Sequence, residues 1–332
     1  MRRLLHPVVA GGLAYAGAIA LMACGITIIY MCTRTFNFAH ATMCTWGFYV
    51  TYTMVELYGG TPYQYFPLAF LVGALLGAVC YFGINRRLLR RKASEITLMM
   101  STLGYHMMLL ALIQIYCDYL TYKLGLYPRR VTMSVHDVEV AGVRASTIIS
   151  ICLAVGILTV LHLFMTRTKF GIAMRATVEN PMLASVIGIN SEKVYLTSWI
   201  LGGGLAALGG ALVSFVITAT PVLGDMIIVV MFAGSILGGL YSVYGSLLGG
   251  FVVGLAEYLG TYGLSLVLGG WVMGYRLVIP LLIMALTLLL FPRGLAGIPW
   301  RELPTRLREA LRPARVKESL GRLGLGLRRG RT

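Results

Sequence analysis

The sequence predicts an all-α fold, a polytopic transmembrane helical bundle of about eight or nine spans. Of its 332 residues, 58% are hydrophobic and 12% are charged, and the mean hydropathy is +0.81. Soluble domains are roughly a quarter charged and about 45–50% apolar. Apolar runs of about 20 residues recur along the chain. The 40 glycines follow no triplet period and suit helices packed closely in lipid. This composition argues against a soluble enzyme and against a disordered chain.

Nine apolar runs are candidate spans. The first follows Arg2 and Arg3, but it is longer than the roughly 7–15 apolar residues of a signal peptide, so we predict a span. The seventh is short and rich in glycine, which is typical of a broken or re-entrant helix. In order, the runs are Val8–Met31, Ala41–Tyr58, Tyr65–Ile84, Ile96–Cys117, Thr147–Met165, Val194–Thr218, Met226–Leu240, Val243–Leu264 and Leu277–Phe291.

Glycines recur four residues apart within several of these runs. Such spacing places small residues on one face of a helix and lets two helix backbones approach closely. We therefore predict a packing role for them rather than a ligand site. The pairs are Gly73/Gly77, Gly245/Gly249 and Gly250/Gly254.

The charges between the runs predict the orientation. Residues 85–95 carry five Lys or Arg, residues 166–193 carry four against two acids, and residues 118–146 are nearly neutral. The positive-inside rule places the first two segments and the carboxyl terminus in the cytoplasm, with residues 118–146 outside. Alternation then places the amino terminus outside, which Arg2 and Arg3 oppose. Either these two arginines are tolerated outside, or Ala41–Tyr58 does not cross.

The predicted transmembrane domain covers residues 1–298, and residues 299–332 form a basic tail. Residues 293–332 hold 11 Lys or Arg against three acids. Apolar residues at helical spacing predict a basic helix lying on anionic lipid, and a disordered extension is the alternative. No nucleic-acid partner is expected, because no aromatic residues interleave with the basic clusters and both clusters adjoin membrane segments.

The loop 166–193 contains a second type of signal, a short amphipathic helix. Asn180 is suited to cap this helix, with Pro181 at its first position and Gly188 at its end. Met182, Leu183, Val186 and Ile187 follow at helical spacing. The helix is either an interfacial helix or a docking helix for a soluble partner.

Four motifs of the chain are distinctive. The first, in the loop 166–193, comprises Arg175-Ala176, Glu179-Asn180, Ala184 and Gly188-Ile189-Asn190. The others are Phe36-Asn37-Phe38-Ala39-His40, the glycine-rich region from Leu237 to Glu257, and Phe291-Pro292-Arg293-Gly294 with Gly297. Together they resemble the motifs of the branched-chain amino acid ABC-importer permeases, specifically the LivH-type subunit, and the first resembles the cytoplasmic coupling loop of that family. The resemblance covers residues 8–298. The family's glycine after the histidine is Ala41 here, and the tail extends beyond the usual end.

The resemblance implies a permease subunit that moves branched-chain or related hydrophobic amino acids into the cell across the cytoplasmic membrane. The implied partners are ATPase subunits, a second permease subunit of the LivM type, and an extracytoplasmic substrate-binding protein. In this reading Arg175 and Glu179 contact the ATPase, Asn180 and Pro181 start the docking helix, and the small Ala184 and Gly188 let it seat in a groove. The sequence independently favours an external energy source, because none of the five lysines follows a glycine, as a phosphate-binding P-loop requires.

Polar residues within the apolar runs are the remaining candidates. Glu257 lies deepest in a run, and Asn37 and His40 lie near the end of the first hairpin, whereas Asp225 and Arg276 are predicted at outer ends. Buried ionisable groups in membranes usually face a cavity or a partner. Asn37, His40 and Glu257 therefore either line or gate the passage, or pair to fix helix register.

No catalytic, cofactor or metal site is predicted. His106 and His162 are single histidines in apolar runs and are expected to be hydrogen-bonded core residues, and the six cysteines lack metal-ligand spacing. Two further functions stay open: a permease of the same family for urea or short amides, and an ion-coupled secondary transporter. A secondary transporter would carry acids in both halves of the chain, but Glu257 has no counterpart in the first half.

Overall fold

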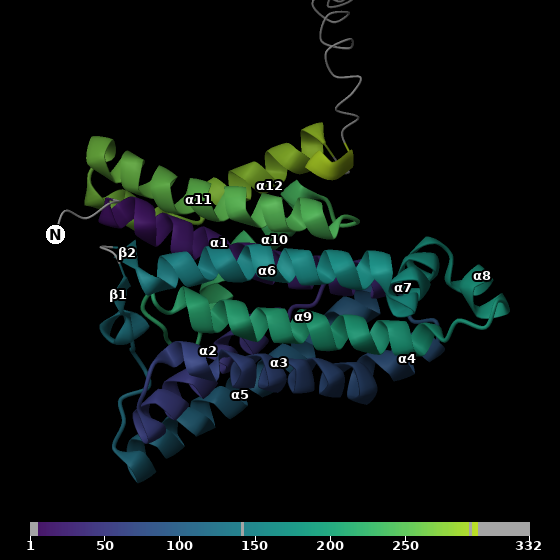
Figure 1. Ribbon diagram of the computed structural model, residues 1–332, viewed down its shortest axis with the longest axis horizontal. Coiled ribbons are helices and arrows are strands. Elements are labelled where there is room, and N and C mark those ends of the chain that lie inside the picture. The colour runs from purple at the N-terminus through teal and green to yellow at the C-terminus, as the bar shows by residue number, and fades with distance from the viewer. Residues whose placement is uncertain (1–5, 141–142, 292–293, 298–332) are drawn as a thin grey trace, which may run out of the picture. The chain divides into compact units, whose positions relative to one another are not determined.

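The computed structural model describes residues 6–140, 143–291 and 294–297. The chain divides into two compact units, Met1–Ala296 and Gly297–Thr332. The predicted basic tail, residues 299–332, lies outside the described residues. Among the described residues, the first unit is helical, with one two-stranded sheet (Figure 1).

Nine of the helices in the described residues form the body of the first unit. They are α1 (Pro7–Thr33), α2 (His40–Tyr58), α3 (Phe66–Cys80), α5 (Glu95–Leu124), α6 (Ala145–Arg167), α9 (Ser191–Val213), α10 (Leu223–Gly238), α11 (Val243–Leu268) and α12 (Val278–Leu290). A π-helical turn, Tyr81–Asn85, continues α3 into the short α4 (Arg86–Arg90).

The connecting segments contain the remaining elements. Two further α-helices, α7 (Lys169–Glu179) and α8 (Pro181–Val186), fill the loop between α6 and α9. The strands β1 (Glu139–Val140) and β2 (Val143–Arg144) pair in antiparallel fashion, with Glu139 opposite Arg144. The 3₁₀ turns are η1 (Pro62–Tyr65), η3 (Met133–His136), η4 (Gly270–Tyr275) and η5 (Leu295–Gly297).

The predicted all-α polytopic bundle is confirmed. Among the described residues, seven helical segments are long and apolar enough to cross a membrane. Two of the nine predicted spans do not meet this criterion. The run Met226–Leu240 forms α10, whose 16 residues are fewer than the roughly 20 that a span needs. The run Ala41–Tyr58 forms α2, which has 19 residues. It contains several threonines, and its mean hydropathy is lower than that of the seven segments.

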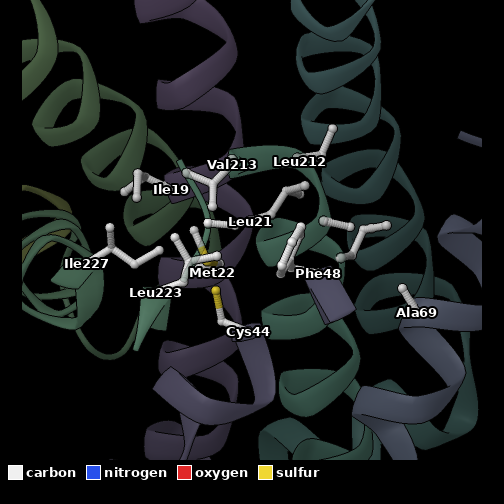
Figure 2. Close-up of a cluster of buried hydrophobic side chains, with 14 of the residues drawn as sticks. Ile19, Leu21, Met22, Cys44, Phe48, Ala69, Leu212, Val213, Leu223 and Ile227 are labelled. Carbon is white, nitrogen blue, oxygen red and sulfur yellow. The ribbon is translucent and has the colours of Figure 1, made fainter. Parts of the chain in front are cut away.

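Helix α1 is the centre of the unit. In an apolar stretch of 18 residues of α1, 94% of the residues are buried within this single chain. Such burial is expected for a helix that is hydrophobic all round. It packs against α6, α9, α10 and α11. Figure 2 shows Ile19, Leu21 and Met22 of α1 among side chains from α2, α9 and α10.

Helices α2 and α10 begin inside the bundle rather than at one of its ends. The chain turns back after Thr33, and the His40 ring at the start of α2 lies 3.0 Å from the carbonyl oxygen of Met22, near the middle of α1. The start of α10 lies beside the start of α2, where the Gly224 N–H donates to Thr45 Oγ1 at 3.0 Å. The short glycine-containing run therefore forms a helix that starts within the core.

The predicted glycine packing is confirmed at α3 and α9. A Cβ atom placed on Gly73 would lie 2.3 Å from the carbonyl oxygen of Gly203, and one on Gly77 would lie 2.1 Å from that of Trp199. Real Cβ atoms do not approach other atoms so closely, so α3 and α9 touch backbone to backbone.

The alanine at position 41 is accommodated because the close approach is made by the opposite helix. Ala41 is fully buried, and its carbonyl oxygen lies 1.8 Å from where a Cβ on Gly224 would stand. The position that excludes a side chain is therefore 224 and not 41.

We predict that Gly73→Val separates α3 from α9 and destabilises the protein by about 1–3 kcal/mol, the usual cost of overpacking a core. The measurement is the thermal unfolding midpoint in detergent. Gly104→Val is the matched control, because Gly104 lies on α5 with open space around its Cα atom. Equal unfolding midpoints for the two variants would contradict the packing described here.

Candidate coupling and translocation sites

The loops predicted to share one side of the membrane lie at one end of the bundle. Arg86 and Arg90 of α4 contact the carboxylate of Glu192 at the start of α9, with N–O distances of 3.0 and 2.6 Å. Helices α7 and α8 lie at this end (Figure 1). The chain after α12 returns to the end of α10, where Gly294 meets Gly239. At the opposite end, Thr147 near the start of α6 donates to the carbonyl oxygen of Ala10.

Helix α7 is anchored to the central helices by one face. Thr168 caps it by accepting a hydrogen bond from the Gly171 N–H at 3.0 Å. Met174 is fully buried in a cluster with residues of α1, α6 and α9, which includes Cys32. The predicted contact residues Arg175 and Glu179 lie exposed, and within the described residues neither forms an ion pair.

Helix α8 has the ends that the sequence predicts. Asn180 Oδ1 accepts a hydrogen bond from the Leu183 N–H at 3.0 Å, and Pro181 occupies the first turn. Gly188 has a φ of +85°, a left-handed conformation that ends helices and favours glycine. The chain beyond it is held by a hydrogen bond from the Ile189 N–H to the carbonyl oxygen of Ala184.

The outer surface of α8 is apolar and uncovered. Ala184 faces inward and is buried, whereas four neighbouring apolar side chains are between 61% and 82% exposed: Met182, Leu183, Val186 and Ile187. A contiguous exposed apolar surface of this kind marks a site for a protein partner or a membrane surface. Since Arg175 and Glu179 lie on the neighbouring helix, the α7–α8 unit combines apolar and charged contact groups.

Asn37 and His40 are buried in the link between α1 and α2. Asn37 Oδ1 accepts a hydrogen bond from the Ala39 N–H at 3.1 Å, which satisfies a backbone donor just before α2. The His40 ring contacts the backbone of α1 at Met22. The His40 contact holds the start of α2 against α1, and the Asn37 contact fixes the turn that leads into α2.

Glu257 lies in a different place, beside Tyr15 of α1 and Arg276, which follows η4. Its carboxylate is 2% exposed, accepts a hydrogen bond from Tyr15 Oη at 2.7 Å, and lies 3.7 Å from Nε of Arg276. Tyr15 and Met22 are seven residues apart on α1, or about 10 Å at 1.5 Å per residue. The structure therefore does not bring Glu257 together with Asn37 and His40.

One pair of ionisable side chains was missed by the sequence analysis. His106 Nε2 lies 3.3 Å from Asp225 Oδ1, with His106 buried and Asp225 36% exposed. Asp225 was predicted at an outer end, but α10 starts inside the bundle, so its first turn is deep. The signal available in the sequence was the acid directly before a run, Met226–Leu240, that was predicted to form a broken or re-entrant helix. A negative charge there also complements the helix dipole.

The two histidines predicted to be core residues, His106 and His162, differ in burial. His106 is buried, and its predicted place in the core is confirmed. His162 is exposed and lies 2.7 Å from Tyr244 Oη on the surface of the unit. That prediction was wrong because α6 exposes one face and His162 lies on it. Within the described ranges, no three His, Cys, Asp or Glu side chains gather as metal ligands would.

Comparison with known proteins identifies the family. The pattern of a family described as "Branched-chain amino acid transport system / permease component" matches residues 8–289. The chain is 38% identical, over 88% of its length and 93% of the relative's, to a Methanocaldococcus jannaschii protein named "Probable branched-chain amino acid transport permease protein LivH". It is 26% identical to the "High-affinity branched-chain amino acid transport system permease protein LivH" of Salmonella typhimurium, over 87% of this chain and 94% of that one.

A protein of Pseudomonas aeruginosa named BraD, with the same description, is 25% identical over 87% of this chain and 94% of its own length. No solved structure matches the chain significantly. The family pattern spans most of the chain, and the relatives align over nearly their full lengths. The chain therefore belongs to the branched-chain amino acid transport system permease family.

Proposed function

We propose that this chain is the permease subunit of an ATP-binding-cassette importer that carries branched-chain or related hydrophobic amino acids into the cell. The substrate class comes from the names of its relatives. The observation that carries the proposal is the α7–α8 unit, an exposed docking surface whose inner face is packed into the central helices. The subunit has no ATPase activity of its own in this proposal, so the energy comes from partner subunits.

The α7–α8 end faces the cytoplasm in this proposal. The supporting observation is that the basic segment 85–95 and the loop 166–193 are joined at this end by the Arg86–Glu192 and Arg90–Glu192 ion pairs. The protein is then a multi-pass protein of the cytoplasmic membrane. Its amino terminus lies outside, so Arg2 and Arg3 are tolerated there, and the chain after α12 returns to the cytoplasmic side.

The α7–α8 unit couples ATPase movement to the membrane helices. Arg175 and Glu179 contact the ATPase through their charges, and the exposed apolar residues of α8 seat in a groove of the partner. Asn180, Pro181, Ala184 and Gly188 set the shape of α8. Because Met174 packs against residues of α1, α6 and α9, a displacement of α7 shifts the most buried helices of the bundle.

The other partners complete the importer. A second permease subunit of the LivM type forms the pathway with this one, and an extracytoplasmic binding protein delivers the substrate to the end opposite α7 and α8. Asn37 and His40 hold the gating helices in register, and Glu257 lines the outer part of the passage. The tail, residues 299–332, contacts anionic lipids. The proposal includes no nucleic acid and no cofactor.

The energy source is tested by reconstituting the chain in liposomes, alone and with its ATPase partners. We expect amino acid uptake only in the assembled complex and only with ATP. Uptake by the isolated chain in an ion gradient would overturn the proposal and favour a secondary transporter. Competition by urea or short amides, without competition by leucine, isoleucine or valine, would favour the other substrate class.

The docking contact is tested by charge reversal. Arg175→Glu and Glu179→Arg are each expected to abolish co-purification of the ATPase subunits with this chain, because the charged contacts become repulsive. Arg130→Glu makes the same charge change as Arg175→Glu, in the nearly neutral segment at the opposite end, and it is the matched control for that variant. If both α7 variants retain the ATPase as well as the control does, α7 is not the contact.

The shape of α8 is tested at its cap. Asn180→Ala removes the acceptor for the Leu183 N–H, which costs about 0.5–2 kcal/mol and raises hydrogen exchange of the α8 amides about two- to thirtyfold. Asn180→Ser keeps a capping oxygen and is expected to leave exchange nearly unchanged. Unaltered exchange in the alanine variant would show that partner or tertiary contacts, and not the cap, determine the helix.

A further inference from the structure

We infer that a cavity beside Glu257 binds the charged backbone groups of a free α-amino acid. The inference rests on the proposed function and adds a location and a recognition chemistry for the substrate. The cavity has a volume of about 260 Å³ and is lined by α1, α11, η4 and the segments that follow α9 and η4. Pockets for drug-sized ligands hold roughly 300–1,000 Å³, so this cavity suits a smaller molecule such as one amino acid.

The cavity contains a pair of opposite charges, complementary in sign to the two charges of a zwitterion. The Glu257 carboxylate and the Arg276 guanidinium both line it, with Arg276 Nε 3.7 Å from Glu257 Oε1. This separation exceeds that of a good hydrogen bond, so the pair has capacity for other partners. Arg276 is 30% exposed, whereas Glu257 is fixed by Tyr15. A carboxylate would bind Arg276, and an ammonium group would bind Glu257.

Thr261 provides an independent observation. The residue lies one turn along α11 from Glu257 and is part of the cavity lining. The residue is 8% exposed, and its oxygen has no hydrogen-bond partner in the structure. A buried hydroxyl without a partner is costly. A polar ligand in the cavity would satisfy it.

The rest of the lining favours an apolar side chain on the ligand. Val8, Ile217 and Met273 contribute aliphatic surface, and Tyr258 and Tyr262 contribute aromatic rings. The cavity lies near the start of α1 and beside η4, at the end opposite α7 and α8. In the proposed orientation this is the side where a binding protein releases its substrate.

The test measures protection of a cysteine reporter in the full-length chain, in nanodiscs without phosphatidylethanolamine. Met273→Cys places the reporter on the cavity wall, where the native side chain is 53% exposed. Trp271→Cys, on the same 3₁₀ turn but outside the cavity lining, is the matched control. Both carry Cys152→Ser, which removes the exposed native cysteine of the described residues.

We expect L-leucine to slow labelling of the Met273→Cys reporter saturably, by about tenfold at about ten times its Kd. Labelling of the control should not change. N-acetyl-leucine amide, which lacks both charges, should give no protection. Thr261→Val preserves the side-chain volume and is expected to raise the Kd for leucine about two- to tenfold, because one hydrogen bond is lost. Arg276→Gln should raise it further, because the lost partner is charged.

The outcomes separate this inference from the proposed function. If leucine gives no protection, although the assembled complex imports amino acids, the inferred binding in the cavity is wrong and the proposed function is unaffected. If leucine protects the reporter saturably, but the assembled complex imports no amino acid, the inferred binding in the cavity is supported and the proposed function is overturned. Protection by phosphoethanolamine but not by leucine would assign the cavity to a lipid headgroup and overturn the inference.

Discussion

The structure depends on the almost complete burial of α1, an apolar helix enclosed within a single chain. Its neighbours α9 and α11 approach it backbone to backbone. A Cβ on Gly202 of α9 would lie 2.9 Å from the carbonyl oxygen of Gly25, and one on Gly250 of α11 would lie 2.8 Å from the Cα of Ala20. In lipid, where burying apolar side chains brings little gain, close packing of this kind is the main source of helix association.

The same central helix links the regions that we assign to function. Its carboxyl-terminal end is packed with Met174 of α7, and its amino-terminal half supplies Tyr15 to the Glu257 carboxylate. The start of α2 is held against its middle through His40. In the proposed function, a movement of α7 therefore reaches a helix that contacts both the internal helix starts and the cavity beside Glu257. Tight packing makes such a helix respond as a unit rather than deform locally.

The starts of α2 and α10 raise a particular physical problem, because the first N–H groups of a helix have no partner within the helix. In a membrane interior each unsatisfied group costs several kcal/mol. The protein meets this need with side chains: Asn37 accepts from the Ala39 N–H, and Thr45 accepts from the Gly224 N–H. Asn37 belongs to a motif that the sequence analysis singled out, and the structure gives that motif a physical reason.

The sequence by itself determined the helical membrane class, the glycine contacts, and the ends of α8 at Asn180 and Gly188, because these follow from composition, periodicity and local capping. Only the tertiary structure decided where the polar residues meet. Glu257 contacts Tyr15, which is 242 residues away along the chain, and Arg276, which is 19 residues away. His106 contacts Asp225, which is 119 residues away. Such pairings depend on where helices start and how they tilt. Helix α10 starts inside the bundle, where Gly224 lies too close to the backbone of Ala41 for a side chain to fit. Hydropathy records how apolar a segment is, but not the depth at which it begins.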